Sequence, residues 1–222
     1  MQIANYQLDY ILQHIEFAAG DSPGNSPHSI LFEFCANQLT AVATDGHQLA
    51  ICELNITAGS EEQLSFTIPA LTLNFVSKYM KQNSCLAAQL HVTQAAVIIR
   101  LPQLAIDFPN HAQLFPAWRT LLENLNFDAS PRHEMPMRYL YELIEHWQEH
   151  VLLPRAEMYY SQKMLQRAFR AWNKKRYLYK TVHFAYSATK HPSVRFIVQD
   201  ERPGVRAQWT YVLAPILMKE AT

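Results

Sequence analysis

A turn signal at Asp45–Gly46 constrains the fold of this chain more than any other feature of its sequence. It joins the run Gln38–Thr44 (QLTAVAT) to the run His47–Leu54 (HQLAICEL), and both runs alternate polar and apolar residues. Asp-Gly between alternating runs is a strong hairpin signal, because a type I′ turn needs positive φ at both central residues. We therefore expect an antiparallel hairpin with His47 directly after its turn.

The rest of the chain alternates between helical and extended patterns. Helical periodicity predicts four helices, at residues 6–19, 71–82, 137–150 and 161–176. Further runs predict strands, at residues 29–36, 63–69, 86–93, 95–102, 104–110, 155–160, 180–188, 193–200 and 207–217. Asn37 and the loop 57–62 are expected to separate strands, and residues 116–136 to form a connection. Because strands come in runs beside segregated helices, the sequence predicts α+β packing rather than a parallel βαβ sheet.

Length and composition indicate a soluble protein of one or two domains. The chain has 222 residues, of which 49% are apolar and 17% charged. No apolar run approaches the roughly 20 residues of a membrane span, and the N-terminus lacks the basic region of a signal peptide. Three cysteines without CxxC spacing favour reduced thiols. We therefore predict a cytoplasmic protein that does not bind membranes.

The charges are segregated although the net charge is zero. No Lys or Arg occurs between Met1 and Ser77, whereas eight occur between Arg155 and Lys180. On the predicted helix 161–176, four cations recur at helical spacing opposite an apolar face: Lys163, Arg167, Arg170 and Lys174. Spaced cations on a helix neutralise phosphates without reading bases, so duplex DNA is a candidate partner. The alternative is an ordinary solvated helix face.

The segment TDGHQLA (Thr44–Ala50), with the strand before it, resembles the signature hairpin of the bacterial DNA polymerase III beta subunit, the sliding clamp. FTIPALTLNFVSKYM (Phe66–Met80) resembles a strand–helix step of that family. DFPNHAQLFPAWRTLL (Asp107–Leu122) is similar to the segment that joins its middle and last domains. WTYVLAPIL (Trp209–Leu217) is similar to its closing strand.

The resemblance implies a DNA-clamp fold of repeated helix-plus-antiparallel-strands units. It implies one full clamp domain at residues 1–122, similar to the middle domain of the beta clamp. Residues 123–222 are then a reduced clamp domain, similar to the last one. In such rings the helices face duplex DNA, so Lys163, Arg167, Arg170 and Lys174 would contact it. Lys78 and Lys81 would contact it from the equivalent helix of the first domain.

The resemblance also implies a pocket between the two domains for short linear peptides of polymerases and clamp loaders. The matching positions are Thr44, Gly46, His47, Leu49, Val212, Ala214, Pro215 and Ile216. Gln48 stands where the family has Arg. Independently of the resemblance, Pro215 cannot donate a ladder hydrogen bond, so it belongs at a sheet edge or in a tail that leaves the sheet. The alternative is that His47 only flanks the turn and that residues 212–217 form a core strand.

The expected function is therefore that of a non-enzymatic, sliding-clamp-like replication accessory protein in bacteria, bacteriophages or mobile elements. The alternative is a clamp-derived interaction module that captures clamp-binding peptides without encircling DNA. A homo-oligomer is possible, but the sequence selects no symmetry.

A metal-dependent enzyme is a distant third hypothesis. His146 and His150 are spaced i, i+4 in the predicted helix 137–150, with Glu149 between them. No HExxH motif, phosphate-binding loop or nucleophile elbow accompanies them, and the chain has only five Gly residues. We therefore predict no metal and no cofactor.

Overall fold

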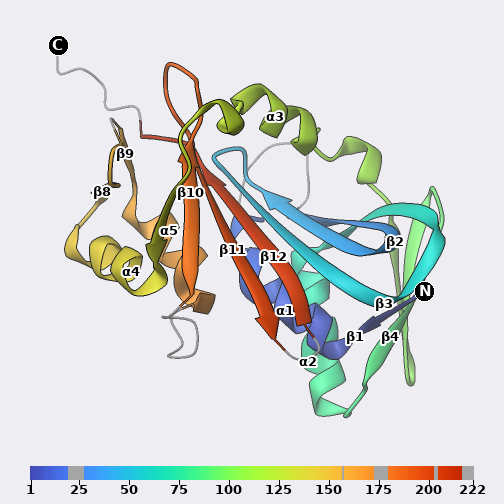
Figure 1. The fold of residues 1–222 in the computed structure, drawn as a ribbon. Helices are drawn as coiled ribbons and strands as arrows, with labels where there is room; N and C mark the ends of the chain where they lie inside the picture. Colours follow the sequence, from blue (N-terminus) through green and yellow to red (C-terminus); the bar gives the residue numbers. More distant parts are fainter. Residues whose placement is uncertain (20–27, 157, 173–179, 203–204, 217–222) are drawn as a thin grey trace. The chain divides into compact units, whose positions relative to one another are not determined.

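The computed structural model describes residues 1–19, 28–156, 158–172, 180–202 and 205–216 (Figure 1). The chain divides into two compact units. The first unit comprises Met1–Gly46, Ala50–Pro116 and Asp200–Gln208, and the second comprises His47–Leu49, Ala117–Gln199 and Trp209–Thr222. The strands β3, β11 and β12 therefore contribute residues to both units.

The first unit repeats one plan twice. Its first half runs through β1 (Gln2–Ala4), α1 (Asn5–Ile15), the 3-10 turn Glu16–Ala18, β2 (Ser29–Thr44) and β3 (Gln48–Pro69). Its second half runs through α2 (Ala70–Gln82), β4 (Ala87–Val92), β5 (Ala96–Leu101) and β6 (Leu104–Pro109). The predicted rhythm of helix followed by strands is thus confirmed, because helical and alternating apolar periods are both strong in this part of the sequence.

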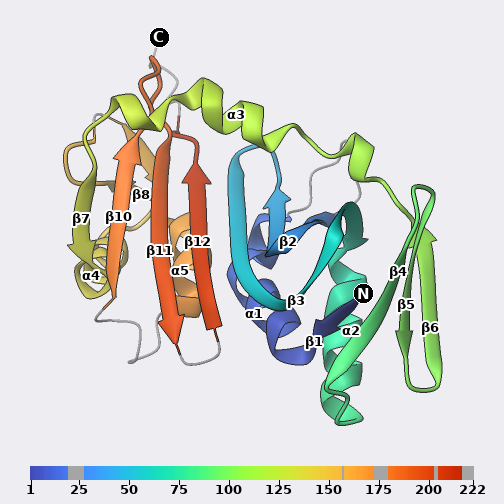
Figure 2. The ribbon, with the colours of Figure 1, turned by 45° about the vertical axis from the view of Figure 1, so that its right-hand side comes forward.

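The two helices of the first unit pack against each other. The apolar face of α1 is fully or almost fully buried, and it comprises Leu8, Ile11, Leu12 and Ile15. From α2, the buried side chains include Leu73, Val76 and Met80. The antiparallel sheet beside them has the strand order β1-β4-β5-β6, and Figure 2 shows β6 at its outer edge.

The β2–β3 hairpin is confirmed, but three details differ from expectation. Residues 29–44 form one strand rather than two, and Ala36, next to the expected break at Asn37, takes a positive φ of 50° without ending the strand. Residues 48–69 likewise form one strand through the expected loop at 57–62. At the turn, Gly46 has a φ of 87° but Asp45 does not have positive φ, so the type I′ turn is wrong.

The second unit carries a shorter first half. After α3 (Trp118–Leu125) and the 3-10 turn Phe127–Ala129 come β7 (His133–Pro136), α4 (Met137–His146) and β8 (His150–Leu152). Then follow β9 (Tyr159–Ser161), α5 (Gln162–Phe169), the 3-10 turn Arg170–Trp172, β10 (Thr181–Tyr186), β11 (Val194–Arg202) and β12 (Val205–Leu213). In strand order β12, β11, β10 and β7 are neighbours, and β8 pairs only with β9.

Three helices of this unit differ from expectation. The helix α3 was expected to be part of a connection, although its apolar residues recur at helical spacing (Trp118, Leu121, Leu122 and Leu125); none of its residues is buried. The predicted helix 137–150 ends at His146, and residues 150–152 pair with β9 instead. The helix expected at 161–176 is α-helical to Phe169 and continues as a 3-10 turn to Trp172. Its remainder lies outside the described residues.

Aromatic side chains form the core of the second unit. Phe169 of α5 meets the ring of Trp209 edge-on at 5.4 Å, and Trp172 lies 5.7 Å from the same ring. Trp209 and Tyr211 point to one face of β12 because they are two residues apart, and their rings stack at 5.7 Å. Figure 2 shows α5 behind β11 and β12. The predicted α+β class is confirmed, and none of the described helices is long and apolar enough to span a bilayer.

Candidate functional site

The turn before His47 is organised by its own residues. The amide of Gly46 donates a hydrogen bond to the Thr44 hydroxyl oxygen at 3.2 Å. A Cβ on Gly46 would meet no atom within 4 Å, so the positive φ rather than crowding calls for glycine here. The His47 side chain, directly after this turn, is exposed.

In the second unit, His47 is joined to the segment that follows β12. The amide of Ala214 donates to the His47 carbonyl oxygen at 3.0 Å, and the amide of Ile216 donates to the Tyr159 carbonyl oxygen at 2.9 Å. Ala214, Pro215 and Ile216 are each half-buried. This short segment, which we call the terminal segment 214–216, is therefore held between the start of β3 and the strand β9.

The neighbouring residues Gln48, Leu49 and Val212 have a different role. Leu49 is 2% exposed and Val212 is 5% exposed, so both belong to the core of the second unit. The Tyr211 hydroxyl donates to Oε1 of Gln48 at 2.9 Å in a buried hydrogen bond. Gln48, the residue that departs from the family pattern, is thus engaged inside the second unit. Thr44 and Gly46 belong to the first unit.

Two aromatic residues that were not predicted as site residues belong to this region. Tyr159 lies next to the terminal segment 214–216, and Trp147 contacts Tyr159. Tyr159, whose carbonyl binds Ile216, meets the Trp147 ring edge-on at 6.4 Å. The Trp147 backbone is held in turn by the Gln162 amide, which donates to the carbonyls of Trp147 and Ile144. Residues 146–150 line an open hollow of about 490 Å³. The adjacent Tyr159 and Tyr160 in the predicted strand 155–160 were the available signal, although only Tyr159 contacts the Trp147 ring and Tyr160 is fully buried.

The cations of α5 form a second candidate site, an exposed stripe. Lys163 and Arg167 of α5 and Arg170 of the following 3-10 turn are exposed, whereas Leu165 and Phe169 on the other side are buried. Ser161 begins the helix, because its hydroxyl accepts the Met164 amide at 3.4 Å. We call Lys163, Arg167 and Arg170 the α5 stripe. Lys174, predicted to extend it, lies outside the described residues.

A carboxylate and a tyrosine lie near one end of the α5 stripe. The Tyr141 hydroxyl donates to the Phe169 carbonyl at 3.0 Å. Burial and the charge of Glu145 raise the pKa of Tyr141 to about 12, although Arg170 opposes that rise. The charges of Arg170 and Glu145 therefore both act on Tyr141. Among the described residues, no ion pair links Lys163 or Arg167 to a carboxylate.

In the first unit, Lys78 and Lys81 are exposed on α2. Lys81 forms an ion pair with Asp9 of α1 at 2.9 Å, and the Ser77 hydroxyl donates to the same carboxylate at 2.5 Å. Part of the Lys81 charge is therefore compensated within the unit. Lys78 is the cation on this helix that extends into solvent.

The spacing argument for a metal at His146 and His150 is wrong. His146 is the last residue of α4 and His150 the first of β8, so one helix does not present both. Among the described residues, no group of three His, Cys, Asp or Glu side chains has the arrangement of a metal site. Burial strongly raises the pKa of the Cys52 thiol, with smaller contributions from Glu53 and Asp200, so Cys52 remains protonated.

Comparison with known proteins places this geometry in context. A family model described as the central domain of the DNA polymerase III beta subunit matches residues 2–107. No curated protein matches the chain in sequence.

Solved structures match over almost the whole chain. A putative DNA polymerase III beta subunit from Eubacterium rectale aligns with a TM-score of 0.74 at 12% identity, covering 98% of this chain and 65% of that one. The beta subunit from Thermotoga maritima aligns with a TM-score of 0.73 at 13% identity, covering 99% of this chain and 65% of that one. A Pseudomonas aeruginosa sliding clamp bound to griselimycin aligns with a TM-score of 0.71 at 14% identity, covering 98% of this chain and 65% of that one.

At these identities the likeness concerns the fold, and the chain spans about 65% of the length of these clamps. The resemblance to the bacterial sliding clamps is confirmed. Residues 2–107 match the family model of the DNA polymerase III beta subunit central domain, and the chain has the fold of the bacterial sliding clamps.

Proposed function

We propose that this protein is a non-enzymatic, sliding-clamp-like accessory factor of DNA replication that acts in the cytoplasm of bacteria, on host, bacteriophage or mobile-element DNA. It binds short linear peptides of DNA polymerases or clamp-loader subunits, and it binds duplex DNA. The observation that carries the proposal is the hydrogen bond between Ala214 and His47, because it sets the terminal segment 214–216 beside an exposed imidazole.

The proposed peptide site consists of His47 and the terminal segment 214–216. Both amides of the segment that can donate, at Ala214 and Ile216, are already bonded within the chain, so a peptide would contact side chains rather than extend a ladder. Half-buried Pro215 and Ile216 offer apolar surface to Leu and Phe anchors of a peptide. The exposed His47 ring adds one polar contact at the rim of that surface.

The proposed DNA contact is the α5 stripe. Three exposed cations on one side of a helix attract phosphates and carry no base-reading geometry, which suits binding that ignores sequence. Lys78 of α2 is the corresponding contact from the first unit.

A second candidate, favoured by a specific observation, is a clamp-derived interaction module that captures such peptides without encircling DNA. The helix α1 carries Asp9 and no Lys or Arg, unlike a helix devoted to phosphate contact.

A fluorescent clamp-binding peptide with Leu and Phe anchors tests the peptide site. We expect saturable binding that His47→Ala weakens about tenfold, whereas the matched variant His191→Ala, another exposed histidine of the second unit, binds as the unmodified chain does. Griselimycin, bound to the P. aeruginosa clamp, serves as a competitor. Equal affinity of both variants would remove His47 from the site.

Binding to a labelled duplex at low salt separates the two candidates. The accessory factor binds the duplex, and reversal of Lys163, Arg167 and Arg170 to Glu abolishes that binding. If the chain is instead an interaction module, it binds the fluorescent peptide but does not bind the duplex. A chain that binds neither ligand contradicts both candidates.

A further inference from the structure

The strand β6 is an open edge of the four-stranded sheet in the first unit (Figure 2). It pairs with β5, and no described strand pairs with its other side. Leu101 and Leu104 are register partners across the two-residue turn Pro102–Gln103, so they form the hydrogen-bonded pair that closes this hairpin. Hydrogen-bonded pairs alternate along the ladder, and the backbone groups of Ala105 and Asp107 therefore point away from β5.

The side chains that β6 turns toward the core are incompletely covered. Leu104, Ile106 and Phe108 are each half-buried, whereas the equivalent residues on β5, such as Val97 and Ile99, are buried. The sheet thus has an apolar row that continues to its edge and stops there. Exposed edges that carry apolar residues are sites where another strand is readily added.

One face of α2, whose Tyr79 reaches the turn before β6, also exposes apolar side chains. Leu71 is 79% exposed and Phe75 is 51% exposed, one turn apart on the helix. Tyr79, one further turn along, donates its hydroxyl to the Pro102 carbonyl at 2.6 Å and so lies beside the start of β6. Contiguous exposed apolar residues of this kind mark interaction sites.

The sequence of β6 is complementary to itself in the antiparallel direction. When two copies pair about a two-fold axis at Ile106, Leu104 of one copy faces Phe108 of the other, and the apolar row becomes continuous across both sheets. Ala105 faces Asp107, so no like charges oppose each other. The outward-pointing backbone groups of these two residues then exchange hydrogen bonds.

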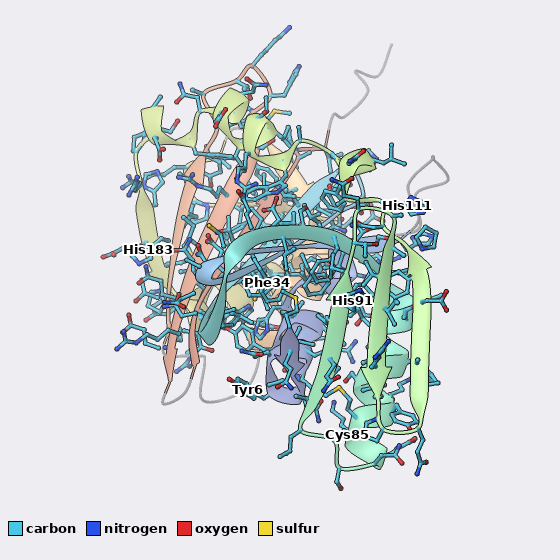
Figure 3. All side chains as sticks on the ribbon, turned by 90° about the vertical axis from the view of Figure 1, so that its right-hand side faces the viewer. Tyr6, Phe34, Cys85, His91, His111 and His183 are labelled. Carbon is cyan, nitrogen blue, oxygen red and sulfur yellow. The ribbon has the colours of Figure 1, made fainter. Side chains whose placement is uncertain are left out.

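Charges on the outer face of the sheet fit the same register. Arg100 of β5 is the partner of Ala105, and both Arg100 and Asp107 are exposed on the face that also bears His91 (Figure 3). In the paired copies only the small Ala105 side chain separates Arg100 from Asp107 of the second copy. The two positions are about 10 Å apart across two strand spacings, within reach of an extended Arg and an Asp. The symmetry produces this pair twice.

We propose that β6 is a dimerisation edge through which two copies of this chain pair antiparallel, with Ile106 on the two-fold axis. The interface is isologous, so it joins two copies and leaves no free equivalent edge for further growth. This inference does not depend on the peptide or DNA sites.

Sedimentation of the full chain over a range of concentrations tests the pairing. We expect a reversible monomer–dimer equilibrium that reaches twice the 25.7 kDa mass of the chain. Ala105→Pro removes an outward amide without disturbing the β5–β6 ladder, so it abolishes the dimer while the melting temperature of the monomer is retained. The control is His91→Gln on the exposed face of β4, opposite Ile98 rather than Arg100, and it leaves the equilibrium unchanged.

Charge reversal identifies the partner. Arg100→Glu and Asp107→Lys each place two like-charged pairs across the axis, and each weakens the dimer about tenfold. A mixture of these two variants forms heterodimers in which both pairs are again opposite in charge, so dimerisation returns to its original strength. An intramolecular effect would not be rescued by mixing. A chain that stays monomeric at about 100 μM, or a dimer unaffected by Ala105→Pro, overturns the proposal.

Discussion

The amide nitrogen of Ala214 lies 3.0 Å from the carbonyl oxygen of His47. The strands β12 and β3 are neighbours in their sheet, and β12 ends at Leu213. This bond keeps the next residue, Ala214, beside the start of β3. It leaves the His47 ring exposed and directs the chain through Pro215 to Ile216, which is bound to Tyr159. The position of the terminal segment 214–216 therefore depends on two backbone hydrogen bonds.

Removing the first of these bonds tests that dependence. Ala214→Pro has no amide hydrogen to donate to His47. The free energy that holds the segment in place therefore falls by about 1 kcal/mol, and peptide affinity falls about fivefold. Fluorescence anisotropy with the labelled peptide measures the change. Ala214→Ser keeps the amide and should bind like the unmodified chain. If the proline variant binds equally well, the segment does not need this bond to present its surface.

The α5 stripe predicts a characteristic salt dependence. Arg167→Glu removes a phosphate contact, so the slope of log K against log salt becomes shallower by about one. Lys190→Glu changes an exposed cation of the second unit outside the stripe and should leave the slope unaltered. Titration of a labelled duplex over a series of salt concentrations distinguishes them. Identical slopes for both variants would show that the stripe is a solvated helix face.

The thiols should differ sharply in reactivity. Cys35 is exposed, whereas Cys52 is fully buried and its pKa is strongly raised by that burial. Because the thiolate is the reactive form, an alkylating reagent at about pH 8 should modify Cys35 rapidly and leave Cys52 unmodified in the folded protein. Mass spectrometry of digested protein locates the label. Cys35→Ser should abolish the rapid reaction, and rapid labelling of Cys52 would contradict its placement in the core.

Asp128 should make the second unit more stable at neutral than at acidic pH. The guanidinium groups of Arg195 and Arg132 each donate a hydrogen bond to its carboxylate at 3.1 Å, and they lower its pKa. A carboxyl whose pKa is lower in the folded state stabilises the protein above the unfolded value, about 3.9, and this contribution is lost as pH falls through the folded value. Arg195 also packs over the Phe127 ring at 4.8 Å, which limits its freedom.

Asp128→Asn should therefore lower the melting temperature more at about pH 7 than at about pH 3, where part of the contribution of the carboxylate is lost. Thermal unfolding monitored by circular dichroism at both values measures the difference. Glu123→Gln, which neutralises an exposed carboxylate of α3, is the control. Equal shifts at the two pH values would mean that the introduced amide acts through packing or hydrogen bonding rather than through the loss of charge.

Local periodicity made much of the fold predictable. The α5 segment was recognised because buried Leu165 and Phe169 and exposed Lys163 and Arg167 recur at the helical period. The hairpin at Gly46 was recognised because glycine adopts positive φ without strain. His47 and Ala214 could be named as site residues only through the family resemblance, since no local pattern links positions so distant in sequence.

The sequence by itself determined which segments are amphipathic, where the chain turns and how charge is distributed, because each of these depends on neighbours a few residues away. Only the tertiary structure decided that β2 continues through Ala36, that Trp147 and Tyr159 stand near the terminal segment, and that β6 ends its sheet with no described strand on its outer side. These outcomes depend on which segments pair and what covers them. A strand at an edge and a strand in the middle carry the same alternating pattern, and only their neighbours distinguish them.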